Sequence, residues 1–130
     1  MNKNTKQLID YWLKAAHKDL KVMESLFETK HYAYSLYFGH LVLEKALKGY
    51  YVRSVGKTTP YTHNLLYLSE KCQLKLDADQ NGLLEVVTRF NIEARYPDIK
   101  FKFYKMCTKK FAQKYIRDIK RFYKWLIKQI

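Results

Sequence analysis

The sequence contains few of the residues that interrupt regular structure or crosslink a small fold. Its 130 residues include four glycines, two prolines and two cysteines, whereas 48% are hydrophobic and 16% are aromatic. This composition argues against long disordered or low-complexity stretches, which lack the apolar surface needed to fold. A chain of this length fits one domain and buries roughly two thirds of its unfolded surface. We therefore expect a single domain over residues 1–130.

Several functional patterns are also missing. Cys72 and Cys107 have no Cys-x-x-Cys spacing, and the N-terminus does not resemble a signal peptide, which predicts a reducing cytoplasm. The most apolar stretch, residues 33–43, is well short of the roughly 20 residues that span a bilayer, so we expect no membrane segment. Metal-binding histidine spacings and phosphate-binding glycine loops are absent, so we expect neither metal nor cofactor.

Acidic residues are scarce at the C-terminal end. The whole chain has 25 basic and 12 acidic residues, a net charge of +13, and residues 100–130 hold eleven of the basic residues against one acidic residue. Such a balance favours a polyanionic partner such as nucleic acid. We expect a basic ridge on one helical face to steer a polyanion electrostatically rather than to form the site itself. The ridge comprises Lys110, Lys114, Arg117, Arg121, Lys124 and Lys128.

Apolar residues recur at steps of three and four along most of the chain, which predicts helices. No stretch alternates with the period of a strand. Thr62 and Asp79 are candidate N-caps, and Tyr96-Pro97 ends the helix that precedes it. The sequence thus predicts an all-α fold, an up-down helical bundle of four to five helices with a long basic C-terminal helix. The expected helices cover about residues 5–29, 31–54, 62–72, 79–93 and 100–130.

The expected helix over residues 31–54 is apolar on nearly every side in its first half. Such a helix must be covered on every side. Its own neighbours can provide the cover, or a second subunit can provide part of it. We expect this helix to serve both the core and a homodimer interface.

The same helix carries charged residues that allow two interpretations. Glu44 and Lys48 stand four residues apart, as in a surface ion pair, but Lys45 and Lys48 can also face a groove and bind phosphate. His63 lies at the expected start of the next helix. It can act as a base or ligand contact, or it can form a hydrogen bond within the loop.

A second set of candidates flanks the end of the expected fourth helix. Arg89, Arg95 and Tyr96 place two guanidinium groups beside an aromatic ring, a combination suited to phosphate binding and base stacking. In the alternative interpretation, Arg89 is solvated and Arg95 anchors the loop before Pro97.

Six short segments occur in a characteristic order along the chain. They are Trp12-Leu13-Lys14-Ala15-Ala16, Asp19-Leu20, His31-Tyr32-Ala33, Glu44-Lys45-Ala46-Leu47-Lys48, Pro60-Tyr61-Thr62-His63-Asn64-Leu65 and Ala94-Arg95-Tyr96-Pro97-Asp98. Taken in this order, they resemble the HEPN domain. The resemblance implies a compact bundle of four or five helices, usually a homodimer, often encoded beside a minimal nucleotidyltransferase as a two-gene toxin–antitoxin system. It also implies nucleotide or RNA binding, and many such domains are metal-independent ribonucleases with an Arg-x(4–6)-His motif.

The sequence departs from the nuclease motif. Nine residues separate Arg53 from His63, and the nearest cation at a suitable spacing before His63 is Lys57. After Arg89, the motif's histidine position holds Arg95, and a permanently protonated guanidinium cannot serve as a base. The absence of this motif therefore argues against enzymatic activity.

The resemblance and the candidate residues together predict a nucleotide- or RNA-binding protein with a nucleotidyltransferase partner. One alternative is a metal-independent ribonuclease that uses His63 with Lys57 or Arg95. Another is a non-catalytic dimeric scaffold that docks an acidic partner. The expected binding residues are Lys45, Lys48, Arg89, Arg95 and Tyr96.

Overall fold

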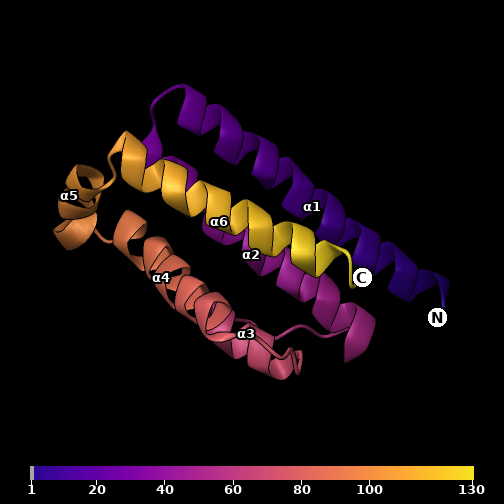
Figure 1. Ribbon diagram of the computed structural model, residues 1–130. Helices are drawn as coiled ribbons and strands as arrows, with labels where there is room; N and C mark the ends of the chain where they lie inside the picture. The colour runs from indigo at the N-terminus through magenta and orange to yellow at the C-terminus, as the bar shows by residue number, and fades with distance from the viewer. Residues whose placement is uncertain (1) are drawn as a thin grey trace.

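A computed structural model describes residues 2–130, and the described chain forms six helices joined by short connections (Figure 1). The all-helical class is confirmed, with six helices in place of the four to five expected. Within residues 2–130, none of the helices combines the length and the apolar character that crossing a membrane requires. The helices are α1 (Lys3–Glu28), α2 (Tyr32–Ser54), α3 (Leu65–Lys71), α4 (Ala78–Arg95), α5 (Pro97–Met106) and α6 (Lys109–Ile127).

The four long helices α1, α2, α4 and α6 run alongside one another in alternating directions, while α3 and α5 lie at opposite ends of α4 (Figure 1). Helix α2 packs against all five of the others. Close packing requires Gly39, because a Cβ atom there would lie 2.6 Å from the Ile119 Cδ1 of α6 and 3.2 Å from the Met23 Sδ of α1. The cover that the apolar helix needs is thus provided within one chain, and a homodimer through α2 remains a proposal.

Two helices begin at residues other than those predicted. Asn64 caps α3 and Asp77 caps α4, so the predictions of Thr62 and Asp79 as caps were wrong. The Asp77 carboxylate accepts the backbone N–H of Gln80 at 2.8 Å, and the Gln80 side chain accepts the backbone N–H of Asp77 at 3.0 Å. This reciprocal capping box satisfies two backbone donors at once and starts α4 at Ala78, two residues earlier than a cap at Asp79 would.

The predicted long C-terminal helix is in fact two helices. The chain leaves helical geometry at Cys107, where ψ is 72°, and Thr108 caps α6 by accepting the backbone N–H of Phe111 at 3.2 Å. The apolar spacing between Tyr104 and Leu126 predicts a buried stripe that includes Thr108, but Thr108 is exposed. Threonine competes well for the cap position because its hydroxyl replaces a missing helical partner. The rest of the expected stripe, from Tyr104 to Leu126, is buried or half-buried.

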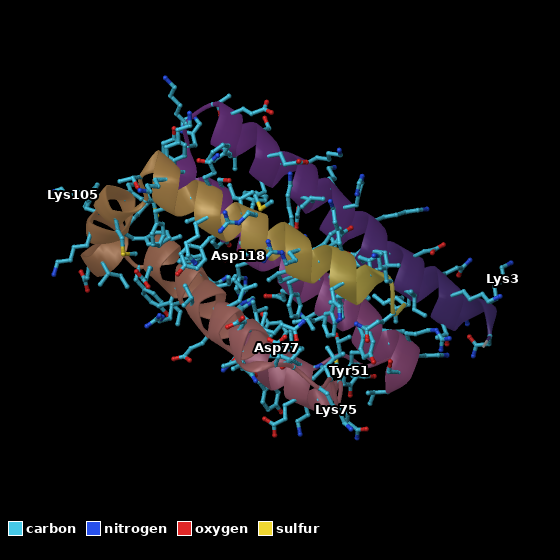
Figure 2. All side chains as sticks on the ribbon, viewed as in Figure 1. Lys3, Tyr51, Lys75, Asp77, Lys105 and Asp118 are labelled. Atoms are coloured by element: carbon cyan, nitrogen blue, oxygen red, sulfur yellow. The ribbon has the colours of Figure 1, made fainter. Side chains whose placement is uncertain are left out.

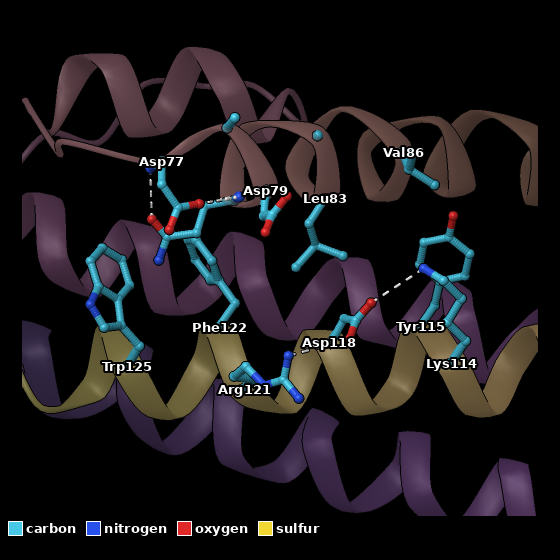
Figure 3. Close-up of a pocket in the computed structure, with 13 residues that line it drawn as sticks. Asp77, Asp79, Leu83, Val86, Lys114, Tyr115, Asp118, Arg121, Phe122 and Trp125 are labelled. Carbon is cyan, nitrogen blue, oxygen red and sulfur yellow. Dashed lines mark hydrogen bonds and ion pairs between the residues drawn. The ribbon is translucent and has the colours of Figure 1, made fainter.

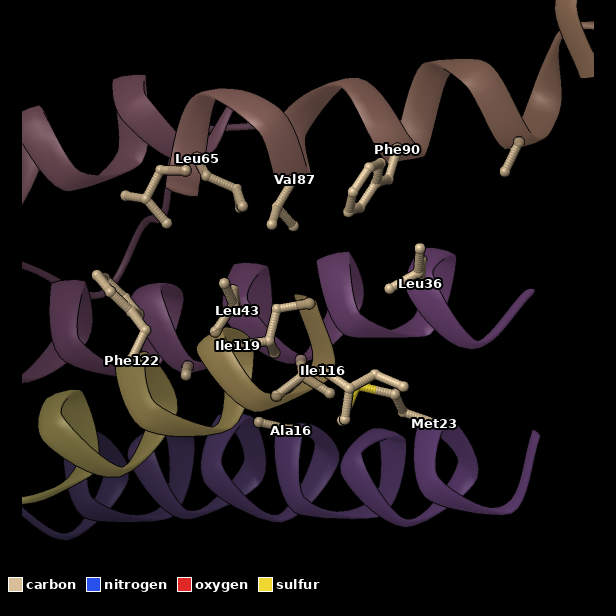
Figure 4. Packing of buried hydrophobic residues seen from close by; sticks show 14 of the residues in the cluster. Ala16, Met23, Leu36, Leu43, Leu65, Val87, Phe90, Ile116, Ile119 and Phe122 are labelled. Carbon is tan, nitrogen blue, oxygen red and sulfur yellow. The ribbon is translucent and has the colours of Figure 1, made fainter. Parts of the chain in front are cut away.

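The apolar core fills the space between α2 and the surrounding helices (Figure 4). Phe90 of α4 lies where α4, α5 and α6 meet and is 1% exposed. Its ring centroid lies 5.5 Å from that of Phe103, 6.1 Å from that of Phe111 and 5.3 Å from that of Tyr115. Aromatic pairs at these separations add to the stabilisation from burial alone.

Phe90→Ala should lower the free energy of unfolding by about 3–5 kcal/mol, because it removes a fully buried ring and leaves a cavity. Urea denaturation followed by circular dichroism measures this loss. Ile92→Ala, on the same helix but 44% exposed, should change the free energy by less than about 0.5 kcal/mol. Equal losses in the two variants would contradict the packing described for Phe90.

Candidate functional site

Polar side chains gather at core positions on one side of α2. His40, Glu44 and Lys48 are spaced by four residues and are 0%, 5% and 8% exposed. Residues at this spacing share a helical face. They contact His63, from the connection before α3, and Asn91, a buried residue of α4. We call these five residues the His–Glu cluster.

The Glu44 carboxylate is the centre of this cluster. One oxygen accepts a hydrogen bond from His63 Nδ1 at 2.8 Å, and the other accepts one from Lys48 Nζ at 3.0 Å. Burial alone would raise the pKa of Glu44, but the hydrogen bonds from His63 and Lys48 bring it below its ordinary value. The predicted Glu44–Lys48 pair is therefore present, but it is a buried pair and the expectation of a surface pair was wrong.

His40 joins the loop to two helices. Its Nε2 lies 2.7 Å from the backbone oxygen of His63, which can only accept, so Nε2 carries a proton. Its Nδ1 then accepts from the Asn91 side-chain amide at 3.3 Å. Burial lowers the pKa of His40, and this effect outweighs the hydrogen bond to the His63 backbone and the charge of Glu44, which both raise it. His40 is thus a neutral imidazole that ties the His63 backbone and α4 to α2.

His63 is the member of the cluster that reaches solvent. Its side chain is 47% exposed, and its Nδ1 is engaged by Glu44. Among the described residues, no hydrogen bond involves its other ring nitrogen, Nε2. With Nδ1 donating to the carboxylate, Nε2 presents a lone pair at the surface. A ring oriented in this way can accept a proton or a hydrogen bond.

The two predicted lysines lie in different surroundings. Lys45 Nζ contacts the Asp19 carboxylate of α1 at 2.6 Å, outside the cluster. Lys48 is held by Glu44, and its Nζ lies 5.4 Å from the ring centroid of Trp12. The two lysines therefore do not form the shared phosphate groove that the sequence suggested.

The two predicted arginines also separate. The guanidinium carbon of Arg95 lies 6.0 Å from the ring centroid of Tyr96, and the Arg95 charge is the smallest of the effects that lower the pKa of His40. Arg89 lies six residues earlier, and at about 100° per residue the two side chains leave α4 on different sides. The structure therefore pairs Arg95 with Tyr96 and leaves Arg89 apart from both.

Three members of the cluster were not predicted as site residues: Glu44, which was expected only as the ion-pair partner of Lys48, and His40 and Asn91. His40 falls within an apolar run, and Asn91 falls on the buried stripe of α4 with Leu84 and Val87. A polar residue at a core position was the available signal, because buried polar groups need partners. Asn91 Oδ1 is buried and has no hydrogen-bond partner in the described structure.

The predicted basic ridge is exposed along α6, and charged tips project outward around the bundle (Figure 2). Three of its residues surround Asp118, at 3.4 Å from Lys114, 3.5 Å from Arg117 and 4.0 Å from Arg121. One carboxylate therefore offsets part of the ridge charge at its middle. Among residues 2–130, no group of three or more His, Cys, Asp or Glu side chains is placed to hold a metal ion.

A comparison with protein-family models matches residues 9–130 to the HEPN domain. The match covers nearly the whole chain, so the protein belongs to the HEPN family, as the ordered motifs predicted. This membership indicates a function related to nucleotides or RNA. Comparisons with curated proteins and with solved structures gave no significant match.

The low pKa of buried His40 makes stability depend on pH. In the unfolded chain this histidine is protonated below its ordinary pKa of 6.5, whereas in the folded protein its lowered pKa keeps it neutral to a lower pH. The unfolded state then binds more protons, so the free energy of unfolding should fall as the pH drops from about 7 to 5. Urea denaturation across this range measures the slope.

His40→Gln should flatten that slope, because it removes the imidazole whose pKa differs between the folded and unfolded states while keeping a side-chain donor. His31→Gln, at an exposed position, should leave the slope unchanged. A wild-type slope retained in His40→Gln would show that another group causes the dependence.

Proposed function

We propose that this HEPN protein binds RNA or a nucleotide at the opening of the His–Glu cluster, where His63, Arg95 and Tyr96 reach the surface. The observation that carries the proposal is the 2.8 Å contact between His63 Nδ1 and Glu44, which orients the exposed imidazole. Family membership and the net charge of +13 support a polyanionic ligand.

Each exposed group suits one part of a nucleotide. The Arg95 guanidinium can bind phosphate through paired N–H donors. The ring of Tyr96, 53% exposed, can stack on a base. His63 Nε2 can accept from a ribose hydroxyl. Lys48 is a positioning residue in this scheme, because it holds Glu44 in its charged form.

Arg95→Ala should weaken binding of a short fluorescent RNA at least tenfold, because it removes the phosphate-binding fork beside the cluster. Fluorescence anisotropy at fixed salt measures the dissociation constant. Arg89→Ala is the matched control, since it removes the same charge from the same helix on a different side. Equal weakening in both variants would indicate general charge attraction and would count against this site.

A second candidate function is metal-independent RNA cleavage, which the Glu44–His63 contact favours. In this reaction His63 Nε2 takes the proton of a ribose 2′-hydroxyl, whose oxygen attacks the adjacent phosphorus. The bond from phosphorus to the 5′-oxygen breaks, the protonated His63 returns its proton to that oxygen, and a 2′,3′-cyclic phosphate remains. Arg95 or Lys57 would stabilise charge on the phosphate.

His63→Ala should abolish cleavage of an unstructured RNA in the presence of EDTA, because the general base is removed. Gel analysis of end-labelled RNA gives the rate. His31→Ala should cleave like the wild type, since His31 lies outside the cluster. Cleavage that survives His63→Ala, or a wild type that does not cleave, rules out this mechanism while leaving the binding proposal open.

The assembly expected from the sequence also remains a proposal. Family membership supports a homodimer, and we propose in addition a minimal nucleotidyltransferase partner in a toxin–antitoxin pair. The molar mass in solution tests the dimer. Co-purification with the product of a neighbouring nucleotidyltransferase gene tests the partner, and recovery of growth upon co-expression tests the toxin–antitoxin relation.

A further inference from the structure

A groove of about 640 Å³ lies between α4 and α6 (Figure 3). Residues of the His–Glu cluster do not line it. Its volume falls within the range of pockets that hold small organic ligands. We call it the α4–α6 groove, and the lining residues that matter here are Asp79, Leu83, Val86, Arg121, Phe122 and Trp125.

The walls of the groove are apolar and aromatic. Phe122 and Trp125 point from α6 toward α4, with ring centroids 5.4 Å apart and planes tilted by 54° (Figure 3). Leu83 points toward α6 from α4, and Val86 lies opposite Tyr115 (Figure 3). Phe122 is only 3% exposed, whereas Trp125 is half-buried, so Trp125 is the ring that can stack on a flat ligand.

One carboxylate in the groove is available to a ligand. Asp79 points from α4 toward α6 (Figure 3), and within residues 2–130 no ion pair or hydrogen bond occupies its carboxylate. The other two acids of the groove are engaged, Asp77 in the capping box and Asp118 with three basic residues. Asp79 is therefore an acceptor in the same groove as the Trp125 ring.

Positive charge lies at the same groove. The Arg121 side chain is 75% exposed and its closest carboxylate oxygen, on Asp118, is 4.0 Å away. Lys114 is 56% exposed and contacts Asp118 at 3.4 Å. Both side chains have N–H donors left over for phosphate oxygens. The aromatic ring and the carboxylate together complement the base of a nucleotide, and the cations complement its phosphate.

We propose that the α4–α6 groove binds guanine, either in a free nucleotide or as an unpaired guanosine in RNA. The Watson–Crick edge of guanine carries two adjacent donors, N1–H and the N2 amine, which match the two acceptor oxygens of Asp79. Adenine carries a lone pair at N1, which a carboxylate repels. The groove is separate from the site in the proposed function and stands without it.

The tryptophan in the groove allows a direct binding test. The chain has two tryptophans, so Trp12→Phe leaves Trp125 as the only tryptophan, and its fluorescence can be excited at wavelengths that tyrosine does not absorb. GMP should quench this signal saturably, IMP should bind more weakly because it lacks the N2 amine, and AMP should bind at least tenfold more weakly than GMP. Isothermal titration calorimetry of the wild type with the same nucleotides gives a second measurement that does not depend on Trp12→Phe.

Asp79→Asn should weaken GMP binding at least tenfold, because one of the two acceptor oxygens becomes a donor. Asp98→Asn is the matched control, since it makes the same charge change at the second residue of another helix, α5. Equal affinity for GMP and AMP, or unchanged GMP binding in Asp79→Asn, overturns the proposal.

Two further experiments distinguish this site from the site of the proposed function and show whether the guanine belongs to a free nucleotide or to RNA. Asp79→Asn should leave Arg95-dependent binding of a guanine-free RNA unchanged, and Arg95→Ala should leave GMP binding unchanged. An oligoadenylate with one internal guanosine is then compared with GMP. Tighter binding of the oligonucleotide points to RNA, and tighter binding of GMP points to the free nucleotide.

Discussion

A buried negative charge on Glu44 constrains much of this structure. A carboxylate that loses its water must be paired with a positive charge and hydrogen-bonded, or it becomes protonated. Glu44 meets this condition with Lys48 from its own helix and His63 from the following loop. Because His40 binds the His63 backbone and Asn91, the same charge indirectly fixes the loop and α4 against α2. Removing one partner of such a pair typically costs about 3–5 kcal/mol.

The helices that sequence periodicity locates best are those with uninterrupted patterns. The prediction of residues 31–54 for α2 differs from the observed Tyr32–Ser54 by one residue at the start. The break between α5 and α6 could not be read in this way, because the apolar spacing continues through Cys107 and Thr108. Helix α6 starts anew because the Thr108 hydroxyl, in place of a backbone carbonyl, accepts the backbone N–H of Phe111. Such capping does not change the spacing of the apolar residues, so periodicity cannot reveal it.

The sequence predicted only those residues of the candidate site whose side-chain type suggests a function. His63 and Arg95 were identified from residue type and from their place beside helix ends. His40 and Asn91 lie 51 positions apart in the sequence and meet only through the packing of α2 against α4. Arg89 and Arg95 were grouped because they are neighbours in sequence, but helical rotation separates them. Which candidate residues lie together depends on the direction of each side chain, and that direction is set by the helix or loop that carries the residue.

The single residue between α4 and α5 and the two residues between α5 and α6 have a mechanical consequence. Stiff helices joined by such short connections behave as three bars with pivots at Tyr96 and at Cys107–Thr108. The first connection carries Tyr96 beside Arg95. The α4–α6 groove is lined by residues 77–86 at the other end of α4. The two proposed sites therefore lie at opposite ends of one helix.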